Sequence, residues 1–299
     1  MKDVPELGSS IKIGWSFSQI DFDRFAKLSG DNNPIHVDPV FSSQTHFGRP
    51  VAHGMLLFGV LSGQLHRALQ PDSLVVAQEM MFTAPTYADE SLMISLELES
   101  VDQPPQLAIV KTVFENGDGS FGLLGQAAVC GQLTSIAKGT MAALPWVSET
   151  SSSESVTSEA IRYKGMALGQ TAENKRAFSA ADLVEYADLT GDQNPLFTDV
   201  AAAQEKGLAN IMIPLPLLCG LFSGLLGTHL PGRGTNWLKL NVALTRPAFV
   251  DEEITAVVKI VRLRPEKDLV NLKTLCIDQN GDSVCVGEAL VLTRDVLES

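Results

Sequence analysis

Gly30-Asp31-Asn32-Asn33-Pro34-Ile35-His36 is the stretch that decides the fold, because the chain carries a second version of it, Gly191-Asp192-Gln193-Asn194-Pro195-Leu196-Phe197. The match extends in both directions, so that residues 17–65 align with residues 178–226 at a constant offset of 161. Further on, residues 83–90 answer residues 245–252 at an offset of 162. A repeat of this length means that one structural unit occurs twice. The identical pairs include Phe17/Phe178, Ser18/Ser179, Asp21/Asp182, Gly30/Gly191, Asp31/Asp192, Asn33/Asn194, Pro34/Pro195, Asp38/Asp199, Gly59/Gly220, Ser62/Ser223 and Gly63/Gly224.

A polar stretch separates the two repeats. Residues 148–155 read SETSSSES and have no periodic apolar face, which is typical of a flexible linker. We therefore expect a first domain over residues 1–145, a linker over 146–160 and a second domain over 161–299.

Within each repeat the local signals run in the same order. Ser18 followed by Asp21 predicts a helix start, and Gly30 stands where a left-handed residue would end that helix. A polar turn follows over residues 31–34. Residues 54–69 are apolar nearly all round, so a helix there must be buried on most sides.

The rest of each repeat alternates as β-strands do. Ile254, Ala256, Val258 and Ile260 interleave with residues of the opposite face, and Gly-Asp and Asn-Gly turns separate the apolar runs. One buried helix and four or more antiparallel strands predict an α+β unit in which a sheet wraps round a helix. Two such units are expected to pair their sheets edge to edge, since each would otherwise expose an open edge.

Composition excludes several partners. The chain has 299 residues, 45% of them hydrophobic, and its 22 basic and 35 acidic residues give a net charge of −13. Nucleic acid and anionic membranes are therefore not expected as partners. No signal peptide or long apolar span is present, so we expect a cytoplasmic protein. The cysteines, expected as reduced and buried thiols, are Cys130, Cys219, Cys276 and Cys285.

The histidines distinguish the two repeats. Four of the five lie in the first repeat, and none keeps its imidazole in the second. The Asp and Asn framework is retained in both copies, whereas the groups that titrate near neutral pH are retained in one. This asymmetry predicts one working site, in the first repeat. The four pairs are His36/Phe197, His46/Gly207, His53/Pro214 and His66/Gly227.

Residues 26–39 (AKLSGDNNPIHVDP) and 47–55 (FGRPVAHGM) closely resemble the signature of the MaoC-like, R-specific enoyl-CoA hydratase family. The resemblance implies a tandem double hotdog fold and a role in fatty acid metabolism. It also implies a hydro-lyase that converts a trans-2-enoyl-CoA to the (R)-3-hydroxyacyl-CoA, or the reverse.

The same resemblance makes Asp31 and His36 the catalytic pair and places Gly54 in an oxyanion hole. The chemistry agrees with these roles, because hydration needs a base to activate water, an acid to protonate C2 and a fixed donor for the thioester oxygen. The amide of Gly54, at the start of a buried helix, can be that donor.

Further residues are candidates for substrate binding or support: Asn33, His53 and Ser62. Asn33 and Asp38 also occur in the second repeat, which favours a role in fixing the turn or capping a helix. Ser62 has a match in Ser223, so a structural role is equally open for it. His53 is expected either to line the pocket or to bond to nearby backbone, and His46 and His66 to be surface or packed histidines.

No metal or other cofactor is expected, since the substrate carries its own coenzyme A. The basic residues considered for the CoA phosphates are Arg49, Arg67, Arg233, Lys239 and Arg246. One chain already holds the pair of hotdogs that single-domain relatives assemble from two, so we expect a pseudo-dimer, and a homodimer of whole chains stays open.

Three alternatives stay open from the sequence. A metal hydrolase could use His36 and Asp38 as ligands, although their spacing fits no common ligand motif. A dehydratase could act on a 3-hydroxyacyl group or polyketide held by an acyl carrier protein. A non-catalytic hotdog could bind acyl thioesters as a scaffold.

Overall fold

The computed structural model describes residues 7–69, 73–102, 107–131 and 162–296. The predicted linker over residues 146–160 lies outside the described residues, and so do the two domain boundaries that flank it.

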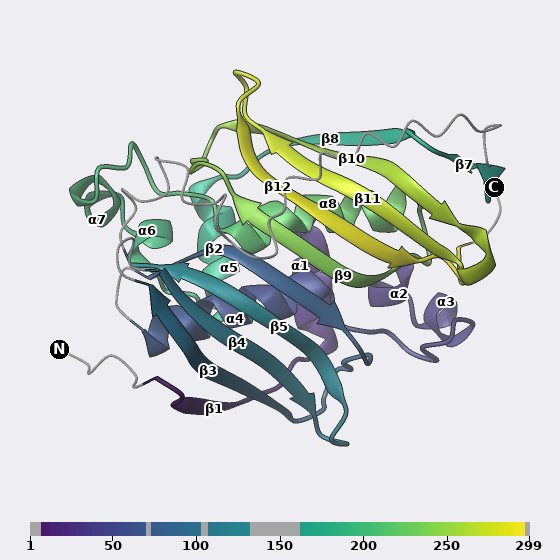
Figure 1. Cartoon of the computed structure of the whole chain (residues 1–299), viewed down its shortest axis with the longest axis horizontal. Helices are drawn as coiled ribbons and strands as arrows, with labels where there is room; N and C mark the ends of the chain where they lie inside the picture. Colours follow the sequence, from purple (N-terminus) through teal and green to yellow (C-terminus); the bar gives the residue numbers. More distant parts are fainter. Residues whose placement is uncertain (1–6, 70–72, 103–106, 132–161, 297–299) are drawn as a thin grey trace.

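A single antiparallel sheet of ten strands forms one layer of the molecule (Figure 1). Its strand order is β1-β3-β4-β5-β2-β9-β12-β11-β10-β8. The order in one half, read outward from the centre, is the order in the other half, as expected for a duplicated unit. The strands are β1 Ser10–Trp15, β2 Leu74–Phe82, β3 Leu92–Asp102, β4 Leu107–Asn116, β5 Phe121–Cys130, β8 Thr171–Ala177, β9 Asn236–Leu244, β10 Glu253–Arg264, β11 Leu269–Ile277 and β12 Ser283–Leu292.

The two halves join through β2 and β9, which pair antiparallel from Ala77 opposite Ala243 to Met81 opposite Lys239. The predicted edge-to-edge pairing of two sheets is therefore confirmed. Two short strands, β6 Arg162–Tyr163 and β7 Met166–Ala167, form a separate ribbon.

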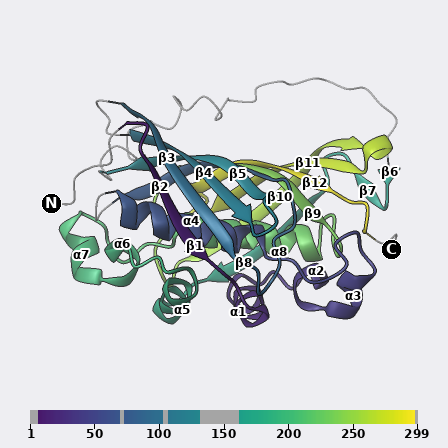
Figure 2. The same cartoon turned by 90° about the horizontal axis from the view of Figure 1, so that it is seen from below.

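The helices gather on one side of the sheet (Figure 2). In the first half they are α1 Gln19–Ser29, α2 Pro34–Val37, α3 Pro39–Ser43 and α4 Gly54–Ala68. In the second half they are α5 Ala180–Thr190, α6 Pro195–Thr198, α7 Val200–Glu205 and α8 Leu215–Thr228, and a 3-10 turn spans Pro265–Lys267.

Helices α1 and α5 begin and end as the sequence predicts. The Ser18 hydroxyl accepts from the amide of Asp21, whose carboxylate accepts from the amide of Ser18 in return. Gly30 ends the helix with a φ of 80°, a left-handed conformation that glycine adopts without strain. Ser179 and Gly191 do the same for α5.

The central helices α4 and α8 are buried along most of their length, as predicted. Each packs against the Asp-containing loop of the other repeat, and glycines permit the close approach. A Cβ atom on Gly63 of α4 would lie 2.9 Å from the Cα of Asp192, and one on Gly224 of α8 would lie 3.2 Å from the carbonyl oxygen of Gly30. The two repeats therefore share one core and complete each other's loops.

One local prediction is corrected. The segment after Asp31 is not only a turn, because Pro34 begins the one-turn helix α2 and the Asn33 side chain caps it. Proline suits this first helical position, where its missing N–H has no partner to lose. Asp38 caps the following helix α3, which confirms its expected role.

All four cysteines are buried free thiols, as expected, and Cys276 lies directly opposite Cys285 on neighbouring strands. None of the helices in the described residues is long and apolar enough to cross a bilayer.

Candidate active site

A cavity of about 300 Å³ lies where the Asp31 loop of the first repeat meets the second repeat. From the first repeat it is lined by Asp31, His36 and Gly54, among others. The facing wall comes from the second repeat, and includes Ser223, Leu226, Gly227, Trp237 and Leu238. The predicted catalytic residues therefore meet at one cavity, but two repeats build it.

The Asp31 carboxylate is almost fully buried, at 1% exposure, and is held by hydrogen bonds on both oxygens. Its Oδ1 accepts from the amide of Asn33 at 3.2 Å, an interaction local to the turn. Its Oδ2 accepts from the hydroxyl of Ser223, on α8 of the other repeat, at 2.5 Å. A buried carboxylate needs such donors, and these also fix its direction.

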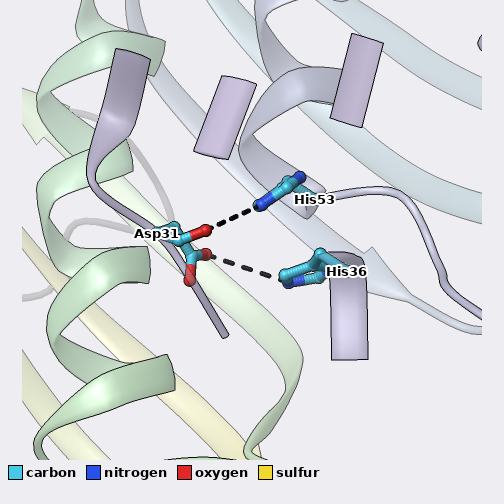
Figure 3. Close-up of side chains that lie close together, drawn as sticks. All are labelled: Asp31, His36 and His53. Carbon is cyan, nitrogen blue, oxygen red and sulfur yellow. Dashed lines mark hydrogen bonds and ion pairs between the residues drawn. The ribbon is translucent and has the colours of Figure 1, made fainter. Parts of the chain in front are cut away.

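His36 faces the carboxylate across a short gap (Figure 3). Its Nε2 lies 3.8 Å from Asp31 Oδ2, while its Nδ1 lies 2.8 Å from the carbonyl oxygen of Val51. A carbonyl oxygen can only accept, so Nδ1 carries the proton and Nε2 of the neutral ring presents its lone pair to the gap. Burial lowers the pKa of His36, and the nearby Asp31 carboxylate and the bond to Val51 oppose that effect.

His53 lies behind this pair and is outside the cavity wall. Its Nε2 donates to the backbone carbonyl oxygen of Asp31 at 3.0 Å, and its ring stacks on that of His36 with centroids 3.8 Å apart (Figure 3). Burial lowers its pKa well below the usual range, and His36 lowers it further. Of the two expectations for His53, the structure therefore places it against backbone, as a neutral ring that supports the Asp31 loop and His36.

Gly54 is the first residue of α4 and lines the cavity. The first amides of a helix have no acceptor within the helix and lie at its positive end, so this position suits a developing oxyanion. The space in front of the Gly54 Cα holds the ring of Phe82, since a Cβ at Gly54 would lie 2.5 Å from Phe82 Cζ. A side chain at position 54 would therefore force the Phe82 ring to move.

Asn33 lines the cavity, and its side chain hydrogen-bonds to the backbone of the second repeat. Its Nδ2 donates to the carbonyl oxygen of Thr235 at 2.9 Å, and its Oδ1 accepts from the amide of Gly234 at 3.1 Å. Asn194 makes the matching bond to the carbonyl oxygen of Ser73. Asn33 therefore ties the two repeats together at the cavity, consistent with its presence in both copies.

The expectation that Ser62 supports the first-repeat site is wrong. Its hydroxyl donates to Asp192 Oδ2 at 2.8 Å, in the second-repeat loop, while Ser223 serves Asp31. The physical reason is the crossed packing of α4 and α8, which carries each helix to the other repeat's loop. Ser62 and Ser223 match in the alignment of the two repeats. Ser223 could have been identified from that match if each central helix had been expected to pack against the loop of the other repeat.

Other cavity residues were missed by the sequence analysis. Gly227 leaves room for the site, because a Cβ there would lie 2.8 Å from Asp31 Oδ1 and 2.6 Å from Asn33 Cβ. His46 is exposed, as expected of a surface histidine, and it also lines the cavity and pairs with Asp295 near the carboxyl end of the described chain. Trp237 contributes an aromatic wall from β9.

The equivalent position in the second repeat lacks the histidine and the glycine of the first-repeat site. Phe197 stands where the first repeat has His36, and Leu215 where it has Gly54. Asp192 is fully buried, and burial raises its pKa to about 6 against the hydrogen bonds from Ser62 and Asn194. The buried Tyr186 beside it has its pKa raised well above the usual range, by burial first and then by Asp192. A carboxyl group without an imidazole partner has no acid–base pair to offer.

The three residues Asp31, His36 and His53 each place one possible metal-ligand atom within 4.8 Å of the others. The hydrogen bonding argues for a different use of them. His53 Nε2 and His36 Nδ1 each donate to a carbonyl oxygen, which leaves His36 Nε2 as the lone pair that faces Asp31 and the cavity. The arrangement is suited to moving protons between Asp31, His36 and a small molecule in the cavity.

Three of the five cations considered for the CoA phosphates are already in ion pairs. Arg49 pairs with Glu90 and lies over the ring of Tyr87. The other two pairings are Lys239 with Glu79, and Arg246 with Asp278 and Asp282. These pairings leave the choice of a phosphate ligand open.

Comparison with known families matches each repeat to a related domain. The MaoC like domain matches residues 4–115, and the FAS1-like dehydratase domain region matches residues 155–286. The (R)-specific enoyl-CoA hydratase of Aeromonas caviae is 37% identical over 128 residues, which are 43% of this chain and 96% of that protein. A mitochondrial 3-hydroxyacyl-[acyl-carrier-protein] dehydratase of Solanum lycopersicum is 29% identical over 144 residues, 48% of this chain and 86% of that protein.

Solved structures match the whole double unit. A MaoC-like dehydratase superposes with a TM-score of 0.77 at 19% identity, over 96% of this chain and 98% of the other. A Mycobacterium tuberculosis protein with a double hotdog fold gives 0.71 at 15% identity, over 96% of each chain. These similarities confirm the fold, and the bacterial hydratase, matched over nearly its full length, shows the family. The chain is a member of the MaoC-like, R-specific enoyl-CoA hydratase family in its tandem double-hotdog form.

Proposed function

We propose that this enzyme adds water to a trans-2-enoyl thioester to give the (R)-3-hydroxyacyl thioester, or catalyses the reverse dehydration, at a single site. The observation that carries the proposal is the 3.8 Å gap between Asp31 Oδ2 and His36 Nε2 at the cavity wall. A water molecule on the cavity side of these two atoms can hydrogen-bond to both at once.

The proton transfers follow from the surroundings of His36 and Asp31. The neutral His36 ring offers a lone pair at Nε2, and the Asp31 carboxylate offers a second acceptor beside it. Together they polarise one water, whose oxygen bonds to C3 of the substrate while C2 gains a proton. The water supplies both the hydroxyl and the proton, so the pair ends the cycle in its starting protonation state. Each positioned acid–base group is typically worth about 10²–10⁴-fold in rate.

The negative charge that develops on the thioester oxygen needs a fixed donor. The amide of Gly54 is suited to this role because it begins the buried helix α4 at the cavity wall. With the oxygen held there, the thioester lies between α4 and the Asp31–His36 pair, which brings C2 and C3 to the acid–base groups.

Coenzyme A is the proposed carrier of the acyl group, as in the name of the Aeromonas caviae relative. The second candidate is a dehydratase acting on acyl carrier protein, since a plant relative bears that name. The net charge of −13 disfavours an acidic carrier protein, and it also requires a local basic patch for the phosphates of coenzyme A. Comparing turnover of one enoyl group on the two carriers separates these candidates.

The test follows the loss of enoyl-thioester absorbance when purified protein meets trans-2-enoyl-CoA substrates of short, medium and long chain. We expect turnover to the R product, abolished by His36→Ala and by Asp31→Asn, with folding retained in both variants. No further cofactor is expected to be needed, so activity should survive treatment with a chelator.

Asp192→Asn is the matched control, since Asp192 lies in the equivalent loop of the second repeat, is buried to the same extent as Asp31 and accepts from Ser62 as Asp31 does from Ser223. It should leave turnover unchanged. Loss of turnover in this variant with stability intact would contradict the single-site proposal. Absence of turnover on every chain length would instead favour the carrier-protein reaction or a binding role.

A further inference from the structure

The ring of Phe82 lies directly against Gly54. A Cβ atom on Gly54 would be 2.5 Å from Cζ, 2.8 Å from Cε1 and 3.1 Å from Cε2 of that ring. Phe82 is the last residue of β2, is half-buried, and lines the cavity together with Gly54. The ring therefore occupies the cavity wall immediately beside the amide that we assign to the oxyanion.

The second repeat provides an internal comparison. Its residues at the positions of Gly54 and Phe82 are Leu215 and Leu244. The equivalence is structural as well as sequential, since Phe82 lies opposite Leu123 in the sheet and Leu244 lies opposite Cys285, at the same offset of 162. The first repeat thus pairs a glycine with a phenylalanine ring, whereas the second repeat has a leucine at both positions.

This exchange shows what Phe82 adds to the first repeat. Because Gly54 has no side chain, its backbone amide at the start of α4 is accessible. The absence of a side chain would also leave an empty space next to its Cα. Phe82 fills that space from the sheet, and no Cβ stands beside the Gly54 amide. The wall next to the thioester is thus an aromatic side chain, whose size can be changed without altering the amide itself.

The substrate atoms nearest this wall follow from the proposed function. If the thioester oxygen binds the Gly54 amide, then C1 and the atoms bonded to it, sulfur and C2, lie beside Gly54 and the adjoining ring. An enoyl thioester is planar, so a methyl group on C2 lies in that plane and widens the substrate next to C1. A single methyl group in a tight apolar pocket is typically worth about 10–200-fold in selectivity.

We propose that Phe82 is a specificity-determining residue that limits this enzyme to enoyl thioesters carrying hydrogen at C2 and excludes those with a methyl branch there. The inference rests on the proposed function, because it uses the position of the thioester at Gly54. It names a substrate class by shape and does not depend on the length of the acyl chain or on the carrier.

The test compares but-2-enoyl-CoA with 2-methylbut-2-enoyl-CoA in wild type, Phe82→Leu and Phe82→Ala, using the full chain. Leucine is the residue that the second repeat uses at this register, so Phe82→Leu is expected to fold. We expect kcat/KM for the branched substrate, relative to the unbranched one, to rise by about tenfold or more in both variants. Leu244→Ala is the matched control, buried at the equivalent position of the other repeat, and should leave the ratio unchanged.

The outcomes separate the two proposals. If the wild type hydrates the unbranched substrate but the ratio stays constant in both Phe82 variants, the Phe82 inference is overturned and the proposed function stands. An equal rise in Leu244→Ala would also overturn it, because a general loosening of the fold would then explain the change. A wild type inactive on the unbranched substrate would refute the proposed function, and the inference with it.

Discussion

Replacing Asp192 by Asn should stabilise the protein at neutral pH. The carboxyl group of Asp192 is fully buried, accepts from Ser62 Oγ at 2.8 Å and from the amide of Asn194 at 3.3 Å, and forms no ion pair with any described residue. Burial raises its pKa from 3.8 to about 6. The folded protein therefore keeps a proton on Asp192 at pH values where the unfolded chain has already released it.

The sign and size follow from this difference. A group whose pKa is raised on folding contributes its full stability below the unfolded value, and loses it as pH rises through the folded value. The rise from 3.8 to about 6, at 1.36 kcal/mol per pKa unit, corresponds to about 3 kcal/mol in total, of which about 2 kcal/mol is lost between pH 4 and pH 7. An asparagine keeps an acceptor for the Asn194 amide but cannot ionise.

Urea unfolding of wild type and Asp192→Asn at a series of pH values measures the effect. Other titrating groups cancel in the difference between the two proteins, provided that they are unaffected by the substitution. The unfolding free energy of the variant, relative to wild type, should increase by about 2 kcal/mol from pH 4 to pH 7. A difference that is constant over this range, or that moves in the opposite direction, would refute the reasoning.

Ser223→Ala should lower turnover by about 10- to 100-fold, since a hydrogen bond to a charged group is worth about 1.5–3 kcal/mol. Ser62→Ala removes the equivalent hydrogen bond at the Asp192 loop and should leave turnover unchanged. The kcat/KM profile should retain activity below pH 6.5, because burial lowers the pKa of His36 and keeps its ring neutral there; a fall in activity centred above 6.5 would contradict this role. Gly227→Ala should abolish turnover, because its Cβ would press on Asp31 Oδ1. Its circular dichroism should stay native, which distinguishes a blocked cavity from an unfolded protein, and titration with substrate measures whether the cavity still binds.

The sequence was sufficient for most of the fold. The capping residues Ser18 and Gly30, the all-apolar helix after His53 and the alternation in the strands each depend on neighbours a few residues apart, and each is where it was predicted. The edge pairing of the two sheets followed from the need to cover an open edge.

The site was predictable only in part. Asp31, His36 and Gly54 could be placed together because a local motif carries them. Phe82 reaches the same cavity because β2 packs against the start of α4 within the first repeat. Ser223 reaches it because the central helices cross between the repeats. Ser62 was assigned to the wrong loop for the same reason, since its own helix serves the other repeat.

The crossed serines have a consequence for how this protein can change over time. Asp31 and His36 belong to the first repeat, whereas Ser223 and Gly227 belong to the second, so each repeat holds half of the working centre. The loop of the second repeat and Ser62 of α4 take no part in that centre, whereas the start of α4 still supplies Gly54. Selection on catalysis therefore acts on a loop and a helix start in the first copy and on the central helix in the second. Neither repeat, produced alone, would carry a complete centre, but mixing the two separately produced repeats could restore one.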